Sequence, residues 1–234
     1  MAYQNYPPSI SGGAGTMSDA LNRAKALCGT TMVKVFGSEF ENDTAYRAAG
    51  TAGTGALSRS TTDKGGVITC TSGATANSTI QLFPNGTTTI WIDNPNTTRW
   101  YVAAKVKWTT TVDSQATLSL LLSTAASGFP VTRFGLSGGT STTNLTVSFT
   151  NNAGVNQYAA TTAVAYDTTS WHLLEEWNDG TNIYFAYDGV TAGSAANTNM
   201  GTSAVVPQIF CTNGTTAAAR TILCDYIWCS TPNN

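Results

Sequence analysis

The stretch WHLLEEWNDGTNIYFAYDG, residues 171–189, decides the fold class of this chain. Residues 171–177 predict one strand, and residues 183–187 predict the strand that returns beside it. Asp-Gly at residues 179–180 predicts the hairpin turn between them, because a type I′ turn needs positive φ values. A second Asp-Gly, at residues 188–189, predicts another turn directly after the return strand. The stretch therefore predicts antiparallel β-structure built from hairpins.

The same period of two continues on both sides of this stretch. In residues 100–108 the even positions are Trp, Val, Ala, Val and Trp, whereas the odd positions are Tyr, Ala, Lys and Lys. This alternation predicts a half-buried antiparallel strand whose second face is polar. The final strand, residues 220–228, is apolar on both faces apart from Thr221 and Asp225, as in a central strand of a sandwich. Further strands are expected at residues 67–70, 78–83, 89–93, 116–122, 131–135, 144–149 and 163–166.

Length and composition agree with one large all-β domain. The chain has 234 residues, and its polar residues are mainly Thr, Ser, Asn and Gly. Charged residues make up only 10%, against about 25% in average proteins, and the net charge is −2. So few cations argue against nucleic acid as a partner. The sequence contains no apolar run long enough for a transmembrane helix, so no membrane contact is expected.

The N-terminal region differs from the rest of the chain. Residues 1–16 are rich in Pro, Ser and Gly and show no core pattern, so they are expected to form an extended arm. A short helix is expected at residues 19–27, with Ser18 as its cap, because apolar residues recur there at helical spacing. Such a short helix is stable only when it packs against something. We therefore divide the chain into an arm with a short helix, residues 1–32, and a β-sandwich, residues 33–234.

The five cysteines predict neither a disulfide framework nor a metal site. Their number is odd, and no Cys-x-x-Cys or Cys/His cluster is present. We expect buried, reduced thiols, no metal and no cofactor. The cysteines are Cys28, Cys70, Cys211, Cys224 and Cys229.

The opening stretch also resembles a known family. Trp-His at residues 171–172, followed by residues 176–181, 183–185 and 187–189, is similar to a pattern of the laminin-G-like and concanavalin A-like families. In those families the final strand carries an Asp followed by apolar residues, as Asp225 does here. Residues 37–41 resemble their opening strand, which pairs beside the final one. The resemblance implies an all-β, two-sheet antiparallel jelly-roll sandwich of the concanavalin A-like kind.

Departures from that family predict a protein without catalytic residues. Glucanases of this fold use two Glu with an Asp between them, at alternate positions of one strand, so that all three face one cleft. Here Glu175 and Glu176 are adjacent and face opposite sides, and Asp179 falls in a turn. His172 is the sole histidine, and the resemblance makes it a structural residue at a strand start. These residues predict a non-enzymatic protein.

Composition and N-terminal sequence together suggest a location. The Thr- and Asn-rich surface, poor in charge, is typical of an extracellular protein, yet residues 1–8 lack the basic region and apolar run of a signal peptide. A virion protein resolves this conflict, because it is assembled in the host cytoplasm and released by lysis. We therefore expect a protein of a virus particle, in particular of a bacteriophage.

The first functional hypothesis is a virion structural protein, either a capsid decoration (cement) protein or a head-fibre component. It would dock through Tyr3, Tyr6, Pro7 and Pro8 in the N-terminal arm. Its partners would be the major capsid protein or tail proteins. A homo-oligomer is expected, and a trimer is one candidate.

The alternative hypothesis is a carbohydrate-binding, lectin-like adhesion module of a phage tail or another surface protein. Such sites stack exposed aromatic rings on sugars. Tyr101 and Tyr184 are the candidates, because both lie opposite the apolar rows of their strands. Glycans would then be the partners.

Overall fold

A computed structural model describes residues 17–38, 46–49, 55–60, 66–84, 92–109, 116–124, 130–137, 143–215 and 217–233. These residues contain one helix and fifteen strands: α1 (Met17–Cys28), β1 (Met32–Ser38), β2 (Tyr46–Ala49), β3 (Ala56–Ser60), β4 (Val67–Thr71), β5 (Thr79–Pro84), β6 (Trp100–Trp108), β7 (Thr117–Ser123), β8 (Pro130–Ser137), β9 (Asn144–Thr150), β10 (Asn156–Ala165), β11 (His172–Asn178), β12 (Asn182–Tyr187), β13 (Val190–Ala196), β14 (Val206–Thr212) and β15 (Thr221–Pro232).

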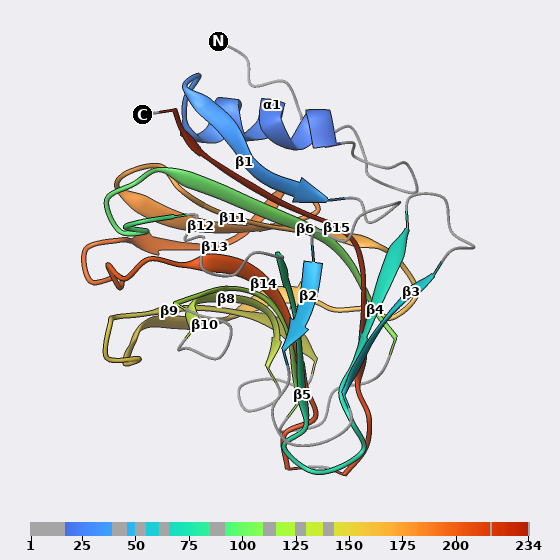
Figure 1. Cartoon of the computed structure of the whole chain (residues 1–234). Helices are drawn as coiled ribbons and strands as arrows, with labels where there is room; N and C mark the ends of the chain where they lie inside the picture. Colours follow the sequence, from blue (N-terminus) through green and yellow to red (C-terminus); the bar gives the residue numbers. More distant parts are fainter. Residues whose placement is uncertain are drawn as a thin grey trace.

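The strands form two antiparallel sheets that lie face to face (Figure 1). Sheet A has eight strands in the order β13-β12-β11-β6-β15-β4-β3, and β1 also pairs with β15. Sheet B has seven strands in the order β10-β9-β8-β7-β14-β5-β2. Several neighbours are far apart in sequence, as in the pairing of β15 with both β1 and β6. The predicted two-sheet jelly-roll sandwich is confirmed, including the opening strand beside the final one.

The core fills the space between the sheets. On β6 the even-numbered side chains are fully buried there, as the alternation predicts, together with large side chains of sheet B. These residues include Trp100, Val102, Val106 and Trp108 from β6, with Phe134 from β8 and Phe149 from β9.

Helix α1 confirms the predicted short helix and covers part of the outer face of sheet A (Figure 1). Ala20, Ala24 and Cys28 are buried against this face, in a cluster with Trp177 and Trp228. Because the helix is only 12 residues long, packing of this kind is what stabilises it. Odd-numbered residues of β6 near the helix are therefore buried too, and the expectation of a polar outer face is wrong there.

The two Asp-Gly turns differ in backbone conformation. The predicted hairpin forms, because β11 pairs with β12, and the predicted second turn leads into β13, which pairs with β12. At residues 188–189 both φ values are positive, 49° and 81°, as a type I′ turn requires. At residues 179–180 only Gly180 has a positive φ, 101°, while the Asp179 carboxylate accepts hydrogen bonds from the backbone N–H groups of Thr181 and Asn182.

The remaining sequence predictions concern the other strands and the cysteines. Most expected strands are present with shifted ends, and all five cysteines are free and buried. Strands β2, β3, β13 and β14 were not predicted. Within residues 89–93 only Ile92 and Asp93 are described, and Ile92 forms an isolated bridge with Val205.

The predicted arm, residues 1–16, lies outside the described residues. The division of the chain at residues 32 and 33 therefore stays a prediction. No helix in the described ranges is both long enough and apolar enough to cross a membrane.

Candidate functional site: a polar groove on sheet B

A polar groove lies over β8, β9 and β10, on the face of sheet B that points away from the core. It encloses about 300 Å³. Its polar lining consists of hydroxyl and amide side chains around one cation: Arg133, Ser137, Thr146, Ser148, Thr150 and Asn156. The lining side chains of β8 and β9 alternate with Phe134, Leu136, Leu145 and Phe149, which point into the core.

The strand register brings these side chains together. Arg133 on β8 lies opposite Ser148 on β9, and Ser148 lies opposite Ala159 on β10. One row across three strands therefore places a cation, a hydroxyl and a small side chain side by side. Side chains that are direct cross-strand neighbours have Cβ atoms about 5 Å apart, which is close enough for one ligand to contact several of them.

Gly135 lies between Arg133 and Ser137 on β8, at a place where the backbone of β7 leaves no room for a side chain. Its φ is +151°, and a Cβ atom there would lie 2.6 Å from the carbonyl oxygen of Leu118. No other residue fits at this position without a shift of β7. The hydroxyl of Thr146, the cross-strand neighbour, donates to the Gly135 carbonyl at 3.2 Å.

The turn between β9 and β10 forms one wall and is held by two asparagines. The Asn151 side-chain oxygen accepts from the backbone N–H groups of Ala153 and Val155, each at 3.0 Å. The Asn152 side-chain oxygen accepts from the N–H of Thr202 at 2.7 Å. Hydrogen bonds of this kind fix the turn, so the groove is largely preformed.

Arg133 is the only charged side chain in the described lining of the groove. Its Nε–H is buried and has no hydrogen-bond partner among the described residues. Burial lowers the pKa of its guanidinium. A buried donor without a partner costs free energy, and this cost falls when an anion or polar ligand occupies the site.

The tyrosines predicted to bind sugars lie on the opposite side of the sandwich. Tyr101 is only 1% exposed, and its hydroxyl donates to Glu175 at 2.8 Å beneath α1, so its ring cannot stack on a ligand. That prediction is wrong, because α1 covers this part of sheet A. Tyr184 is half-buried and stacks on Trp177 with ring centroids 5.0 Å apart. Neither lines the groove. The partner-binding candidates Tyr3, Tyr6, Pro7 and Pro8 lie outside the described residues.

The two adjacent glutamates face opposite sides of sheet A, as predicted. Glu175 points outward and pairs with Arg23 of α1, with Nη2 and Oε2 3.0 Å apart. Glu176 points into the core, where it accepts from the Thr132 hydroxyl. Burial raises the pKa of Glu176 to about 8, which the Thr132 hydrogen bond only partly offsets. The two carboxyl groups therefore cannot act together on one bond.

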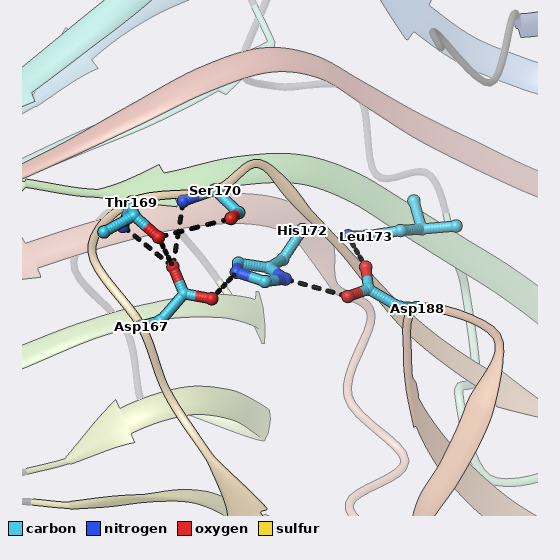
Figure 2. Close-up of polar contacts among 6 residues, drawn as sticks. All are labelled: Asp167, Thr169, Ser170, His172, Leu173 and Asp188. Atoms are coloured by element: carbon cyan, nitrogen blue, oxygen red, sulfur yellow. Dashed lines mark hydrogen bonds and ion pairs between the residues drawn. The ribbon is translucent and has the colours of Figure 1, made fainter. Parts of the chain in front are cut away.

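His172 is clamped between two aspartates, as Figure 2 shows. Its Nδ1 lies 2.8 Å from Asp188, and its Nε2 lies 2.9 Å from Asp167. Burial alone would lower the pKa of His172, but the hydrogen bond and charge of Asp188, followed by those of Asp167, raise it above 6.5. Asp167 also accepts from Thr169 and Ser170. With both ring nitrogens engaged, the histidine ties two turns together and has no nitrogen left for proton transfer.

Metal-ligating side chains do not gather in the part of the chain that the structure describes, where no group of three His, Cys, Asp or Glu could hold an ion. Asp225 of the final strand instead pairs with Lys105 at 2.7 Å.

Sequence reasoning missed the groove, although a signal was present. Residues 144–150, Asn-Leu-Thr-Val-Ser-Phe-Thr, alternate apolar and hydroxyl or amide side chains, so one face of that strand is polar but uncharged. Residues 131–135 place a single arginine among apolar and small residues. A lone cation beside a hydroxyl-rich strand could have indicated a site, but the pairing of these two strands had to be known first.

Known proteins match this chain in structure and not in sequence. No protein-family model matches it, and neither does any curated protein. The structure of an endo-β-1,4-glucuronan lyase from the fungus Trichoderma reesei has a TM-score of 0.61 at 8% identity, covering 86% of this chain and 96% of that one. A β-1,3-1,4-glucanase (lichenase) from a mouse hindgut metagenome has a TM-score of 0.59 at 10% identity, covering 84% and 98%. A carbohydrate esterase of the Shiga toxin-encoding bacteriophage phi24B has a TM-score of 0.55 at 12% identity, covering 86% and 100%.

These structures correct the prediction of a non-enzymatic structural protein. A glucanase and a lyase have this same sandwich over nearly their whole length, so the fold is one that carries carbohydrate-active enzymes. The absence of two Glu and an Asp at alternate positions of one strand was too narrow a reason to exclude an enzyme. At such low identities the likeness shows the fold: this chain is a concanavalin A-like jelly-roll sandwich.

Proposed function

We propose that this chain is a carbohydrate-active protein that holds a polysaccharide in the groove over β8, β9 and β10. The observation that supports this most directly is the lining of the groove. Hydroxyl and amide side chains surround a preformed cavity of about 300 Å³. Sugar rings present many hydroxyl groups, so a lining that both donates and accepts hydrogen bonds is complementary to them.

Cleavage of the bound chain is the activity that we expect. The support is an analogy between folds, since the named activities of the glucuronan lyase and the lichenase are carried by the same sandwich. The groove adds a constraint to this analogy. Its described lining contains no carboxylate, so hydrolysis by a pair of carboxylates gains no support from these residues.

Polysaccharide binding and cleavage can be tested together. Purified protein would be incubated with neutral and acidic polysaccharides, and binding would be measured by calorimetry on oligosaccharides. Cleavage would be followed as new reducing ends and as the ultraviolet absorbance of the unsaturated sugar that an elimination produces. If no polysaccharide binds and none is cleaved, the proposal is wrong.

A variant that fills the groove supplies the control. Ala159 is exposed and lines the groove, so Ala159→Trp would occupy it with an indole ring. Ala163 is exposed on the same strand but is not part of the lining, so Ala163→Trp is the matched control. We expect Ala159→Trp to lose binding and Ala163→Trp to retain it. Equal behaviour of the two variants would mean that the polysaccharide binds elsewhere.

We further propose that the protein acts on a bacteriophage particle, in contact with other virion proteins and as a homo-oligomer. The support is the charge-poor, Thr- and Asn-rich composition, together with the same fold in a phage carbohydrate esterase. Mass spectrometry of purified particles would test the location, and native mass spectrometry would test the oligomer, beginning with a trimer. Absence of the chain from particles would contradict this location and leave the carbohydrate proposal intact.

A further inference from the structure

We propose that Arg133 makes the groove selective for acidic sugars, by binding the carboxylate of a uronic acid unit. This inference rests on the proposed function, because it names the class of polysaccharide that the groove takes. Arg133 lies on β8 between Leu121 of β7 and Ser148 of β9, its cross-strand neighbours. The apolar neighbour and the hydroxyl neighbour offer it no counter-charge.

Arg133 differs in its contacts from Arg23 and Arg99. Arg23 forms an ion pair with Glu175, and Arg99 donates to the Cys28 carbonyl at 3.2 Å. The Nε–H of Arg133 is buried without a partner, and no ion pair within the described ranges includes it. Arg133 is half-buried as a whole, and a buried Nε–H without a partner is unfavourable, so its position in the polar groove points to an anion that binds there.

The chemistry of the lining identifies the kind of anion. A nucleic acid or another dense polyanion needs several cations in a row, but the described lining holds one among neutral hydroxyl and amide groups. A polyuronate has one negative charge on each acidic sugar and several hydroxyl groups around it. Its ratio of charged to neutral polar groups therefore matches that of the lining, which has one arginine among several hydroxyl and amide side chains. The planar guanidinium fork also matches a planar carboxylate, with which it can form two parallel hydrogen bonds.

Neighbouring residues place hydroxyl partners around that charge. Ser148 lies directly across from Arg133, and Thr146 lies across from Gly135, two residues along β8. Ser137 follows at the far end of the same strand face. A sugar ring whose carboxylate contacts Arg133 would therefore lie over the hydroxyl groups of Ser148, Thr146 and Ser137.

The test compares an oligouronide with the same oligosaccharide after its carboxyl groups have been reduced to alcohols. Binding of both to the full chain would be measured by calorimetry, at low and at raised salt. We expect the acidic form to bind about ten-fold or more tightly than the reduced form, and salt to weaken only the acidic form. Arg133→Gln should reduce the preference to about two-fold or less, and Arg133→Lys should keep part of it, because lysine retains the charge but not the fork.

The outcomes separate this inference from the proposed function. If the native chain binds the reduced and acidic forms equally well, the inference is overturned, but the proposal that the chain binds polysaccharide stands. Binding of neither form, nor of any other polysaccharide, overturns both. A sulfated oligosaccharide is included as a third ligand, and tighter binding of it than of the oligouronide would overturn the assignment to a carboxylate. Because the reduced ligand tests the preference without any substitution, the result does not depend on the folding of Arg133→Gln.

Discussion

An arginine lies at the outer face of each sheet, but only the arginine at sheet A has an ion-pair partner among the described residues. On sheet A, α1 covers part of the face, and Arg23 pairs with Glu175, which also accepts from Tyr101. On sheet B, Arg133 lies in a polar groove, and its Nε–H has no partner among the described residues. The cost of burying the first cation is offset within the chain, whereas no described residue offsets the cost of the buried Nε–H of the second. The outer face of sheet A therefore serves stability, and we infer that the outer face of sheet B serves binding.

The largest effect is expected at Glu176, in the core between these two faces. Its folded-state pKa is about 8, against 4.5 for an unperturbed glutamate, because burial opposes its charge. The folded chain therefore holds a proton that the unfolded chain releases, so stability falls as pH rises from 4.5 to about 8 and then levels off. We expect a loss of about 5 kcal/mol across this window in the native chain, and Glu176→Gln should remove most of that loss. Urea denaturation at several pH values measures it.

The control for Glu176→Gln is Asp93→Asn, which removes an exposed carboxylate from the described part of the chain. This variant should follow the native chain at every pH. If Glu176→Gln shows the same dependence on pH as the native chain, Glu176 does not hold a proton in the core.

The second largest effect is expected for the ion pair between Arg23 of α1 and Glu175 of sheet A, which we expect to stabilise the fold. Arg23→Met leaves Glu175 buried with only the Tyr101 hydroxyl as a partner, so we expect a loss of about 3 kcal/mol near neutral pH. Burial raises the pKa of Glu175, and Arg23 opposes this shift, so without Arg23 the carboxyl should take up a proton more readily. The loss should therefore be smaller at about pH 5. Denaturation at both pH values measures it, and an equal loss at both would mean that the charge of Glu175 is not what Arg23 offsets.

A smaller effect is expected at the His172 clamp, which ties the turn before β11 to the turn after β12. Because the folded-state pKa of His172 is raised above 6.5, its charged hydrogen bonds stabilise the fold fully below pH 6.5 and are lost as pH rises through that raised value. His172→Gln should cost about 2 kcal/mol at about pH 6 and less at higher pH. Thermal unfolding across this range measures it. A cost that grows with pH would show that the ring acts through packing, as its stacking on Tyr187 at 4.6 Å would allow.

The sequence could predict local features but not environments. Adjacent positions place Glu175 and Glu176 on opposite faces, and Asp-Gly at residues 188–189 predicts its turn, because both follow from the geometry of a few neighbouring residues. Tyr101 was misplaced because its burial depends on α1, which lies more than 70 positions away in the sequence. Arg133 was overlooked for a similar reason. Whether an arginine is paired depends on which side chains the neighbouring strands bring beside it.

The smallest effect on stability is expected for Arg133→Met, and it gives the most direct comparison with Arg23→Met. Arg133→Met removes a buried donor that has no described partner, so we expect stability to change by about 1 kcal/mol or less, and toward a gain. The same replacement at Arg23 of α1 should instead cost about 3 kcal/mol, although this arginine also lies over the outer face of a sheet. Urea denaturation of the two variants in parallel, together with oligouronide binding by Arg133→Met, measures stability and binding independently. A large loss of stability in Arg133→Met would show that the chain itself provides a partner for this guanidinium. Both arginines would then be structural residues, and the contrast between a stabilising face on sheet A and a binding face on sheet B would be wrong.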